Sequence, residues 1–316
     1  MKREKYWILD NSFLLWSGTF GMVTICKACR GSGCIECNGK GKVQFTNSKG
    51  NVTGGLYLII EKMLARLEEG YKIIFAFDPP RESLERFKLL DTYKASRTEK
   101  PDSIVYQGRV SKDLFPMFGN AESYISDFSE SDDIMATLAL QYSHGGHEVV
   151  VETRDKDLYP VLDLKNVRIY RDGGFLTRDD FMQKYGFTPS RFNEYLALAG
   201  DAADNFNIFP GVGDKAVRDI ISRTQHITQI WDKKVWEDLP KKYKKYLAEH
   251  DEKGQFIKHR KDDLKLSLKI ATLDFNANCI PMNKDKNSEF NIKRILEELE
   301  FYNALKKINI LVGNDD

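Results

Sequence analysis

Nine acidic side chains stand in short patterns whose residue types suit metal-dependent chemistry. Two of them follow apolar runs, and the others lie in the patterns ESDD, DKD and GDAADN. So many carboxylates cannot share one site without cations, because their repulsion would raise their pKa values and destabilise the fold. Hard oxygen ligands suit magnesium or manganese, and two such ions about 4 Å apart can clamp the attacking and leaving oxygens of a phosphodiester. The nine residues are Asp10, Asp78, Glu130, Asp132, Asp133, Asp155, Asp157, Asp201 and Asp204.

Three apolar segments that end in acidic residues must position this set. KYWILD (5–10), KIIFAFD (72–78) and HEVVVETRDKD (147–157) are typical of parallel strands that are buried on both faces. Helical periodicity lies between them, at 54–69 and 132–142. Alternating strands and helices predict an α/β fold with a mostly parallel sheet. Because ligands of such sheets bind at the carboxyl ends of the strands, the acidic residues are expected to converge at one edge.

The character of the chain changes to helical from about residue 190. Helical segments are expected at 191–200, 212–223, 240–249, 261–273 and 291–305. Between the first two, the sequence PGVG forms a P-G-x-G loop that exposes backbone amides at a helix N-terminus, where a phosphate can be accepted. This pattern resembles a helix–hairpin–helix element, which contacts the DNA backbone rather than the bases. Its expected DNA-binding residues are Gly211, Gly213 and Lys215.

A polar, weakly periodic segment lies between residues 80 and 130. Its stretch RFKLLDTYKASR (86–97) contains Arg86, Lys94 and Arg97. If this stretch lies over the acidic edge, the three cations engage a phosphate beside the metals and offset developing charge. Tyr93 is expected to stack on a base. The alternative is a solvated loop.

Four of the five cysteines fall within twelve residues, in CKACRGSGCIECNGKG (26–41). The stretch is two consecutive CxxCxGxG units. Four thiolates suit one tetrahedral, structural zinc ion, and the glycines allow tight knuckles with amides that face sulfur. The alternative is a pair of redox-active or free thiols. The predicted zinc ligands are Cys26, Cys29, Cys34 and Cys37.

Composition is compatible with a nucleic-acid partner. The 316 residues are 41% hydrophobic and carry a formal net charge of only +1. If the carboxylates are gathered around metal ions, however, the remaining surface is basic by a similar amount. No apolar run approaches the roughly 20 residues of a membrane helix. We therefore expect a cytoplasmic protein that is a monomer and has no membrane partner.

Together these motifs resemble the 5′ nuclease family, which includes flap endonucleases and the 5′-nuclease domain of bacterial DNA polymerase I. The matching pieces follow the family's order over residues 5 to about 285. They are ILDNS, SKGNVTGGLY, FAFD, YKASR, ESDDIMATLA, TRDKDLYPVL, ALAGDAADN, FPGVGDKA and DDLKLS. The resemblance implies a PIN-like or resolvase-like α/β nuclease domain over 1–190, with the zinc-knuckle insertion at 26–41 and a helical arch at about 80–128. A helical DNA-binding region with a helix–three-turn–helix would occupy 191–316.

The resemblance also implies roles for the matched residues. Asp10, Asp78, Glu130 and Asp132 would hold the first of two Mg²⁺ (or Mn²⁺) ions. Asp155, Asp157 and Asp204 would hold the second, supported by Asp133 and Asp201. Arg86, Lys94 and Arg97 match the arch residues that contact the scissile phosphate, although Arg86 requires one inserted residue. Gly211 and Gly213 match the hairpin that binds the duplex backbone with a potassium ion.

The implied activity is structure-specific hydrolysis of DNA, or of RNA primers in RNA–DNA, near 5′ ends, flaps, nicks and branches. Such an enzyme acts in replication or repair, and a compact form would suit a bacterium or a phage. Two alternatives remain: a non-catalytic DNA-junction binding protein on the same fold, and a PIN-type ribonuclease. The first is disfavoured because all nine acidic residues are present, and the second because the hairpin is present.

The cysteine insertion is the largest departure from the family pattern. With Lys27, Arg30, Lys40 and Lys42 it is expected to contact DNA near the junction. It would equally serve to stiffen a long loop or to bind a protein partner, and the sequence leaves these alternatives open.

Overall fold

The computed structural model describes residues 3–96, 98–282 and 289–312. The strands are β1 (Lys5–Asp10), β2 (Val23–Ile25), β3 (Lys42–Gln44), β4 (Lys72–Phe77), β5 (Ala121–Ile125), β6 (Glu148–Glu152), β7 (Val167–Arg171), β8 (Gly174–Leu176), β9 (Ala248–His250), β10 (Phe256–His259) and β11 (Ile280–Pro281). The α-helices are α1 (Asn11–Gly21), α2 (Gly54–Glu68), α3 (Glu85–Leu89), α4 (Asp102–Leu114), α5 (Ser131–His144), α6 (Arg178–Tyr185), α7 (Phe192–Ala199), α8 (Asp214–Ser222), α9 (Lys233–Asp238), α10 (Lys241–Leu247), α11 (Lys261–Ala271), α12 (Glu289–Leu299), α13 (Tyr302–Lys306) and α14 (Ile308–Val312).

A seven-stranded sheet with the order β11-β5-β4-β1-β6-β7-β8 forms the centre of the molecule. The five inner strands are parallel, whereas β11 and β8 pair antiparallel at the two edges. The predicted mostly parallel α/β sheet is therefore confirmed. The register pairs Asp10 with Ala76 of β4, and Leu9 with Glu152 of β6. Consequently the first acidic residue of the chain lies in the middle of the carboxyl edge.

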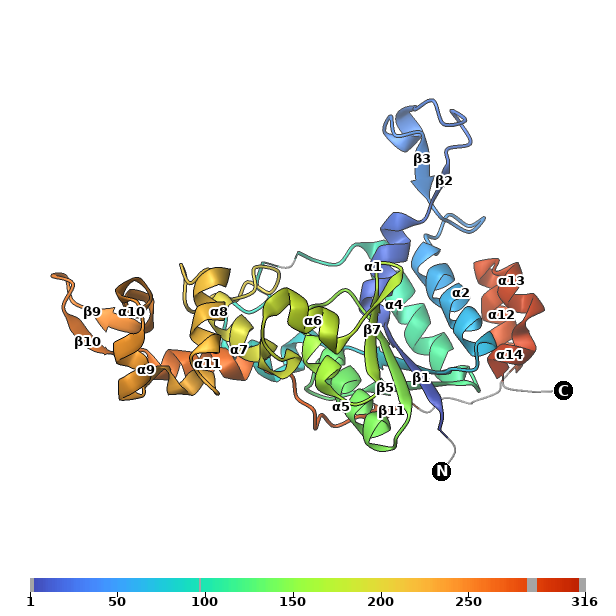
Figure 1. Cartoon of the computed structure of the whole chain (residues 1–316). Coiled ribbons are helices and arrows are strands. Elements are labelled where there is room, and N and C mark those ends of the chain that lie inside the picture. Colours follow the sequence, from blue (N-terminus) through green and yellow to red (C-terminus); the bar gives the residue numbers. More distant parts are fainter. Residues whose placement is uncertain (1–2, 97, 283–288, 313–316) are drawn as a thin grey trace.

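Helices cover both faces of this sheet, because its central strands are apolar on both sides. Along β1, Trp7 and Leu9 belong to the core that contains α2, α12, α13 and α14. Tyr6 and Ile8 face the core that contains α5, α6, α7 and α8. Figure 1 shows these two helical layers on either side of the strands. The last three helices thus pack against the α/β layer beside α2, although the helices from α7 to α11 lie on the other side.

The segment between residues 80 and 120 is more ordered than its sequence suggested. It contains α3 and α4, and Leu114 and Phe115 at the end of α4 are fully buried in the core. The expected range of about 80–128 for an arch is too long, because Ala121–Ile125 forms β5 within the sheet. Strand formation there is favoured by pairing with β4 rather than by the polar sequence AESYI.

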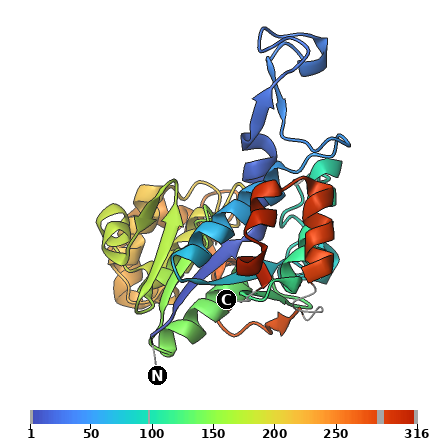
Figure 2. The same cartoon turned by 90° about the vertical axis from the view of Figure 1, so that its right-hand side faces the viewer.

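Residues 23–44 form an arm that stands away from the body (Figures 1 and 2). Strands β2 and β3 pair antiparallel with each other, and the cysteine-rich loop joins them. No helix in the described ranges is long and apolar enough to cross a membrane.

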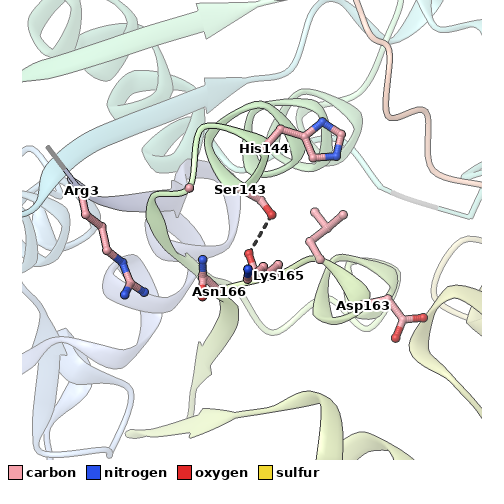
Figure 3. A pocket seen from close by; sticks show the side chains of 8 residues that line it. Arg3, Ser143, His144, Asp163, Lys165 and Asn166 are labelled. Carbon is pink, nitrogen blue, oxygen red and sulfur yellow. Dashed lines mark hydrogen bonds between the residues drawn. The ribbon is translucent and has the colours of Figure 1, made fainter. Parts of the chain in front are cut away.

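A hollow of about 610 Å³ lies at the opposite end of the sheet from the acidic residues. Figure 3 shows its lining side chains, among them Arg3, His144 and Asn166. These residues precede β1, end α5 and precede β7, so they lie at the amino ends of the strands. The hollow is therefore separate from the acidic edge.

Candidate active site

The first two aspartates are held at the ends of neighbouring strands. Asp10 ends β1 and caps α1, with Oδ1 accepting from the Phe13 N–H at 2.9 Å and Oδ2 from the Thr153 hydroxyl at 2.8 Å. Asp78 follows β4 directly, and its Oδ2 accepts from the Ser12 hydroxyl at 2.9 Å. The strand ends and these hydrogen bonds thus orient both carboxylates toward the same edge.

The ESDD motif forms the N-terminus of α5. Glu130 is its N-cap and makes a capping box with Asp133. Asp133 also accepts from the Asp274 N–H at 2.9 Å. The Ser131 N–H donates to Asp78 Oδ1 at 2.9 Å, which ties this helix to the neighbouring strand end. The positive end of the α5 dipole therefore faces the acidic set.

The remaining acidic residues come from two loops. Asp155 and Asp157 follow β6, and Asp155 Oδ1 accepts from the Asp157 N–H at 2.9 Å. Asp201 and Asp204 follow α7, and a backbone bridge between Asp201 and Phe206 closes their loop. Lys156 lies 3.1 Å from Asp201 and so links the two loops. The structure thus brings all nine predicted acidic residues to one edge of the sheet.

Burial and like charge raise the pKa of several of these carboxyl groups. Burial, then the charges of Asp155 and Asp78, raise the pKa of Asp10 to about 7. The pKa values of Asp132 and Asp157 are raised well above their ordinary value, again by burial first and then by neighbouring aspartates. Such carboxylates ionise readily only when a cation compensates them.

Two basic side chains supply part of that compensation. Lys94 pairs with Glu130 and lies 3.7 Å from Asp204, whereas Arg86 bonds Glu130 at 2.8 Å and Asp133 at 2.6 Å. Burial acts to raise the pKa of Glu130, but Lys94 and Arg86 outweigh it and lower the pKa to about 2. The two predicted cations therefore face the acidic edge.

The predictions for Arg97 and Tyr93, the other two residues singled out in this segment, are not confirmed by the structure. Arg97 lies outside the described residues. Tyr93 is only 4% exposed, and its hydroxyl donates to Glu130 at 2.9 Å. The expectation that Tyr93 stacks on a base does not fit this conformation, because its ring is buried beside Phe206 and Ile270.

The carboxylate oxygens of the acidic residues are suitable ligands for divalent cations. Asp157 Oδ1 is buried and has no hydrogen-bond partner in the structure, so a cation would satisfy it. No three of the described carboxylates have their oxygens all within 4.8 Å of one another. Lys94 lies between Glu130 and Asp204, which explains part of this spacing.

The PGVG loop joins α7 and its following loop to α8. Gly211 has φ +93°, and a Cβ there would lie 2.6 Å from the Tyr246 ring, so both backbone and space require glycine. Gly213 is the N-cap of α8, and Lys215 is exposed in its first turn. Gly211 and Gly213 are exposed as well, so the loop is accessible to a ligand.

The four thiolates of the arm have the spacing of a tetrahedral metal site. The Sγ atoms of Cys26 and Cys34 are 3.8 Å apart, and those of Cys29 and Cys37 are 3.7 Å apart. Zinc–sulfur bonds of about 2.3 Å in a tetrahedron put the sulfurs about 3.8 Å apart. All four lie within 4.8 Å of one another. Cys37 Sγ accepts from the Gly41 N–H at 3.1 Å.

Comparison with known proteins shows which sequences and folds this chain is similar to. Residues 39–186 match the model of the 5′-3′ exonuclease N-terminal resolvase-like domain. The chain is 28% identical over 273 residues to the 5′-3′ exonuclease of Aquifex aeolicus, covering 84% of this chain and 88% of that protein. The chain is therefore similar in sequence to 5′-3′ exonucleases over most of its length. The predicted family resemblance is confirmed.

Some relatives are much longer proteins that match this chain over only part of their length. Thermostable DNA polymerase I of Thermus aquaticus is 30% identical over 273 residues, which are 84% of this chain and 31% of that protein. The chain thus spans about a third of the length of its polymerase relatives. The structure of the bacteriophage T5 flap endonuclease with DNA and metal ions superposes with a TM-score of 0.57 at 17% identity, covering 98% of this chain and 100% of that one. This likeness confirms the fold.

Several side chains that orient the acidic residues or Lys94 were not predicted from the sequence. The hydroxyls of Ser12 and Thr153 donate to Asp78 and Asp10. Both residues closely follow a strand, and this position in the sequence could have indicated their role. Arg81 was not predicted either. Its guanidinium donates to the Lys94 carbonyl at 2.6 Å and so holds the backbone of the YKASR motif. No pattern in the sequence reveals that contact.

Proposed function

We propose that this chain is a structure-specific 5′ nuclease that hydrolyses phosphodiester bonds near 5′ ends or flaps of DNA, including RNA primers. The observation that carries the proposal is the convergence of nine carboxylates at the carboxyl edge of the sheet. The raised pKa values of Asp10 and Asp157, and the unpartnered Asp157 oxygen, favour cation binding. Sequence similarity to 5′-3′ exonucleases supports the same reaction.

Two Mg²⁺ or Mn²⁺ ions would supply Lewis-acid activation of water and stabilise both oxygens of the displacement. Asp10, Asp78, Glu130 and Asp132 would hold one ion. Asp155, Asp157 and Asp204 would hold the other, and Asp133 and Asp201 would support them. The donor set consists of carboxylates alone, which favours these hard cations over zinc.

The basic residues beside the acids would bind the scissile phosphate. Lys94 and Arg86 lie within contact distance of Glu130 in a site that is mostly buried. A cation held there is positioned to neutralise phosphate charge as it develops. Arg97, which follows Lys94 by three residues, is proposed to share this role. Arg81 would orient Lys94 through its carbonyl.

The PGVG loop would bind the duplex away from the cleavage point. Exposed amides at the N-terminus of α8 suit a phosphate, and Lys215 adds a charge beside them. We propose a potassium ion at this hairpin. The bound DNA would be a flap, nick, branch or RNA–DNA junction.

One zinc ion would occupy the four thiolates of the arm. Its role would be structural, because four cysteines complete the tetrahedron and leave no position for substrate. We further propose the division into a nuclease domain at 1–190 and a helical region at 191–316. A monomeric state and a bacterial or host-cell cytoplasmic location complete the proposal.

Cleavage of labelled DNA tests the proposed function. A 5′-flap, a nicked duplex and a single strand should each be compared with a matched 3′-flap. Magnesium-dependent cleavage near the 5′ end or junction is expected, because the site would act on 5′ structures. The 3′-flap should remain intact.

EDTA provides the metal control for this assay. It should stop cleavage, and excess magnesium should restore it. Restoration by magnesium excludes irreversible loss of zinc as the cause. Absence of cleavage from every 5′ structure would contradict the proposal and favour a non-catalytic junction-binding protein.

A further inference from the structure

The arm at residues 23–44 projects from the body of the molecule (Figures 1 and 2). Its base is fixed to the body by the Phe45 N–H, which donates to the Met22 carbonyl at 3.1 Å. The Phe45 ring also contacts the Tyr57 ring in a tilted arrangement, with centroids 5.0 Å apart. Gln44 also donates to the Thr19 carbonyl at 3.0 Å. These contacts hold the base of the arm against α1 and α2.

Its outer part is compact because the two CxxCxGxG units pack closely together. Gly41 has φ +68°, and a Cβ there would lie 2.2 Å from the Gly31 carbonyl oxygen. Cys26 and Cys37 are 2% and 5% exposed. The thiolates therefore point inward, and the charged side chains of the loop point to the surface.

The surface of the arm is basic. Lys27, Arg30, Lys40 and Lys42 are all exposed, and none forms an ion pair with a residue that the structure describes. Glu36 is the one acidic residue between Met22 and Asn47. A tetrathiolate zinc centre carries a formal charge of about −2, but it lies inside the arm and is partly balanced by amide hydrogen bonds. Unpaired surface cations of this kind attract polyanions.

Helix α1 connects this basic surface directly to the acidic edge. It begins after Asp10 and ends at Gly21, a span of about 16 Å for eleven residues. Strand β2 adds about 10 Å before Cys26. The basic surface thus lies about 25 Å along the chain from the acids, which corresponds to roughly seven base pairs at about 3.4 Å each.

We infer that the arm is an additional duplex-binding surface that grips the phosphate backbone about one half-turn or more from the cleavage point. This inference rests on the proposed DNA substrate. It assigns the contact to Lys27, Arg30, Lys40 and Lys42, and to backbone phosphates rather than to bases. We assign DNA rather than a protein partner because the four cations have only one acidic neighbour between Met22 and Asn47.

The test measures DNA affinity as a function of duplex length. The arm variant replaces Lys27, Arg30, Lys40 and Lys42 with alanine. A control variant replaces Arg3, Lys5, Lys72 and Lys165, four exposed cations at the amino edge of the sheet, with alanine. Binding is measured by anisotropy without magnesium, manganese or chelator, so that zinc is retained. The flap substrates carry hairpin-closed duplex arms of about 6 or about 18 base pairs.

We expect wild-type protein to bind the long substrate more tightly than the short one. The arm variant should lose this difference, and its affinity for the long substrate should fall by about tenfold or more. The slope of log affinity against log salt should become shallower by about 3 to 4, since each phosphate contact contributes about 0.9. The control variant should retain the length dependence. Zinc content and melting temperature must match those of wild type.

A second variant keeps the test valid if the first one misfolds. Glu36→Lys adds a positive charge at an exposed position and should tighten binding to the long substrate. Unchanged affinity and salt slope in both arm variants would overturn the inference, while cleavage by wild type would leave the proposed function standing. If wild type neither binds nor cleaves DNA, both fail.

Discussion

Asp155→Asn should lower the rate of flap cleavage by more than about a thousandfold, while DNA affinity should change by less than about threefold. The substitution keeps the shape of the side chain and the acceptor oxygen for the Asp157 N–H. It removes one negative charge from the centre of the acidic set, where Asp155 faces Asp204 and Asp201. Single-turnover cleavage and anisotropy separate the two effects.

A matched control for this experiment is Asp172→Asn. Asp172 is exposed and pairs with Arg154 outside the acidic set. Its replacement should leave cleavage within about twofold of wild type, because exposed ion pairs contribute little. Substantial turnover by the Asp155 variant would show that this carboxylate does not hold an essential ion.

Lys94→Met should lower cleavage by about a hundredfold and also weaken the metal-free fold. Lys94 is 8% exposed and pairs with Glu130. Its loss leaves Glu130 buried with Arg86 and the Tyr93 hydroxyl as partners, and should lower the free energy of unfolding by roughly 2 kcal/mol. Thermal unfolding without added magnesium measures this change.

Magnesium distinguishes the structural role of Lys94 from its role at the phosphate. Added magnesium should reduce the difference in stability between Lys94→Met and wild type, because the ion would compensate the same carboxylates. It should not restore cleavage by the variant. Lys88→Met, at an exposed position of α3, is the control and should behave like wild type. Equal unfolding of the Lys94 variant and wild type without magnesium would contradict the assigned pairing.

The strand ends and their acidic residues were predictable because buried parallel strands leave a continuous apolar signal. KYWILD coincides with β1, and KIIFAFD ends one residue beyond β4. Edge strands β8 and β11 gave no such signal, because both are very short. Strand β11 also pairs with β5, which lies far away in the sequence. Helical periodicity over 291–305 also concealed the break at Glu300, where φ is +63°.

Side-chain partners within the site could not be predicted from spacing. The pattern RFKLLDTYKASR predicted that Arg86 and Lys94 bind a phosphate, but not that they pair with Glu130 and Asp133. Tyr93 was expected to stack on a base, yet its ring is buried beside Phe206. The thiolate set was predictable, because a local CxxC spacing brings sulfurs together without long-range packing.

Anomalous diffraction from crystals soaked with manganese tests the central claim most directly. Two peaks about 4 Å apart are expected, the first among Asp10, Asp78, Glu130 and Asp132, and the second among Asp155, Asp157 and Asp204. Crystals of Asp155→Asn should lose the second peak. Manganese bound elsewhere, with none among the carboxylates of a protein that is active with manganese, would contradict the account.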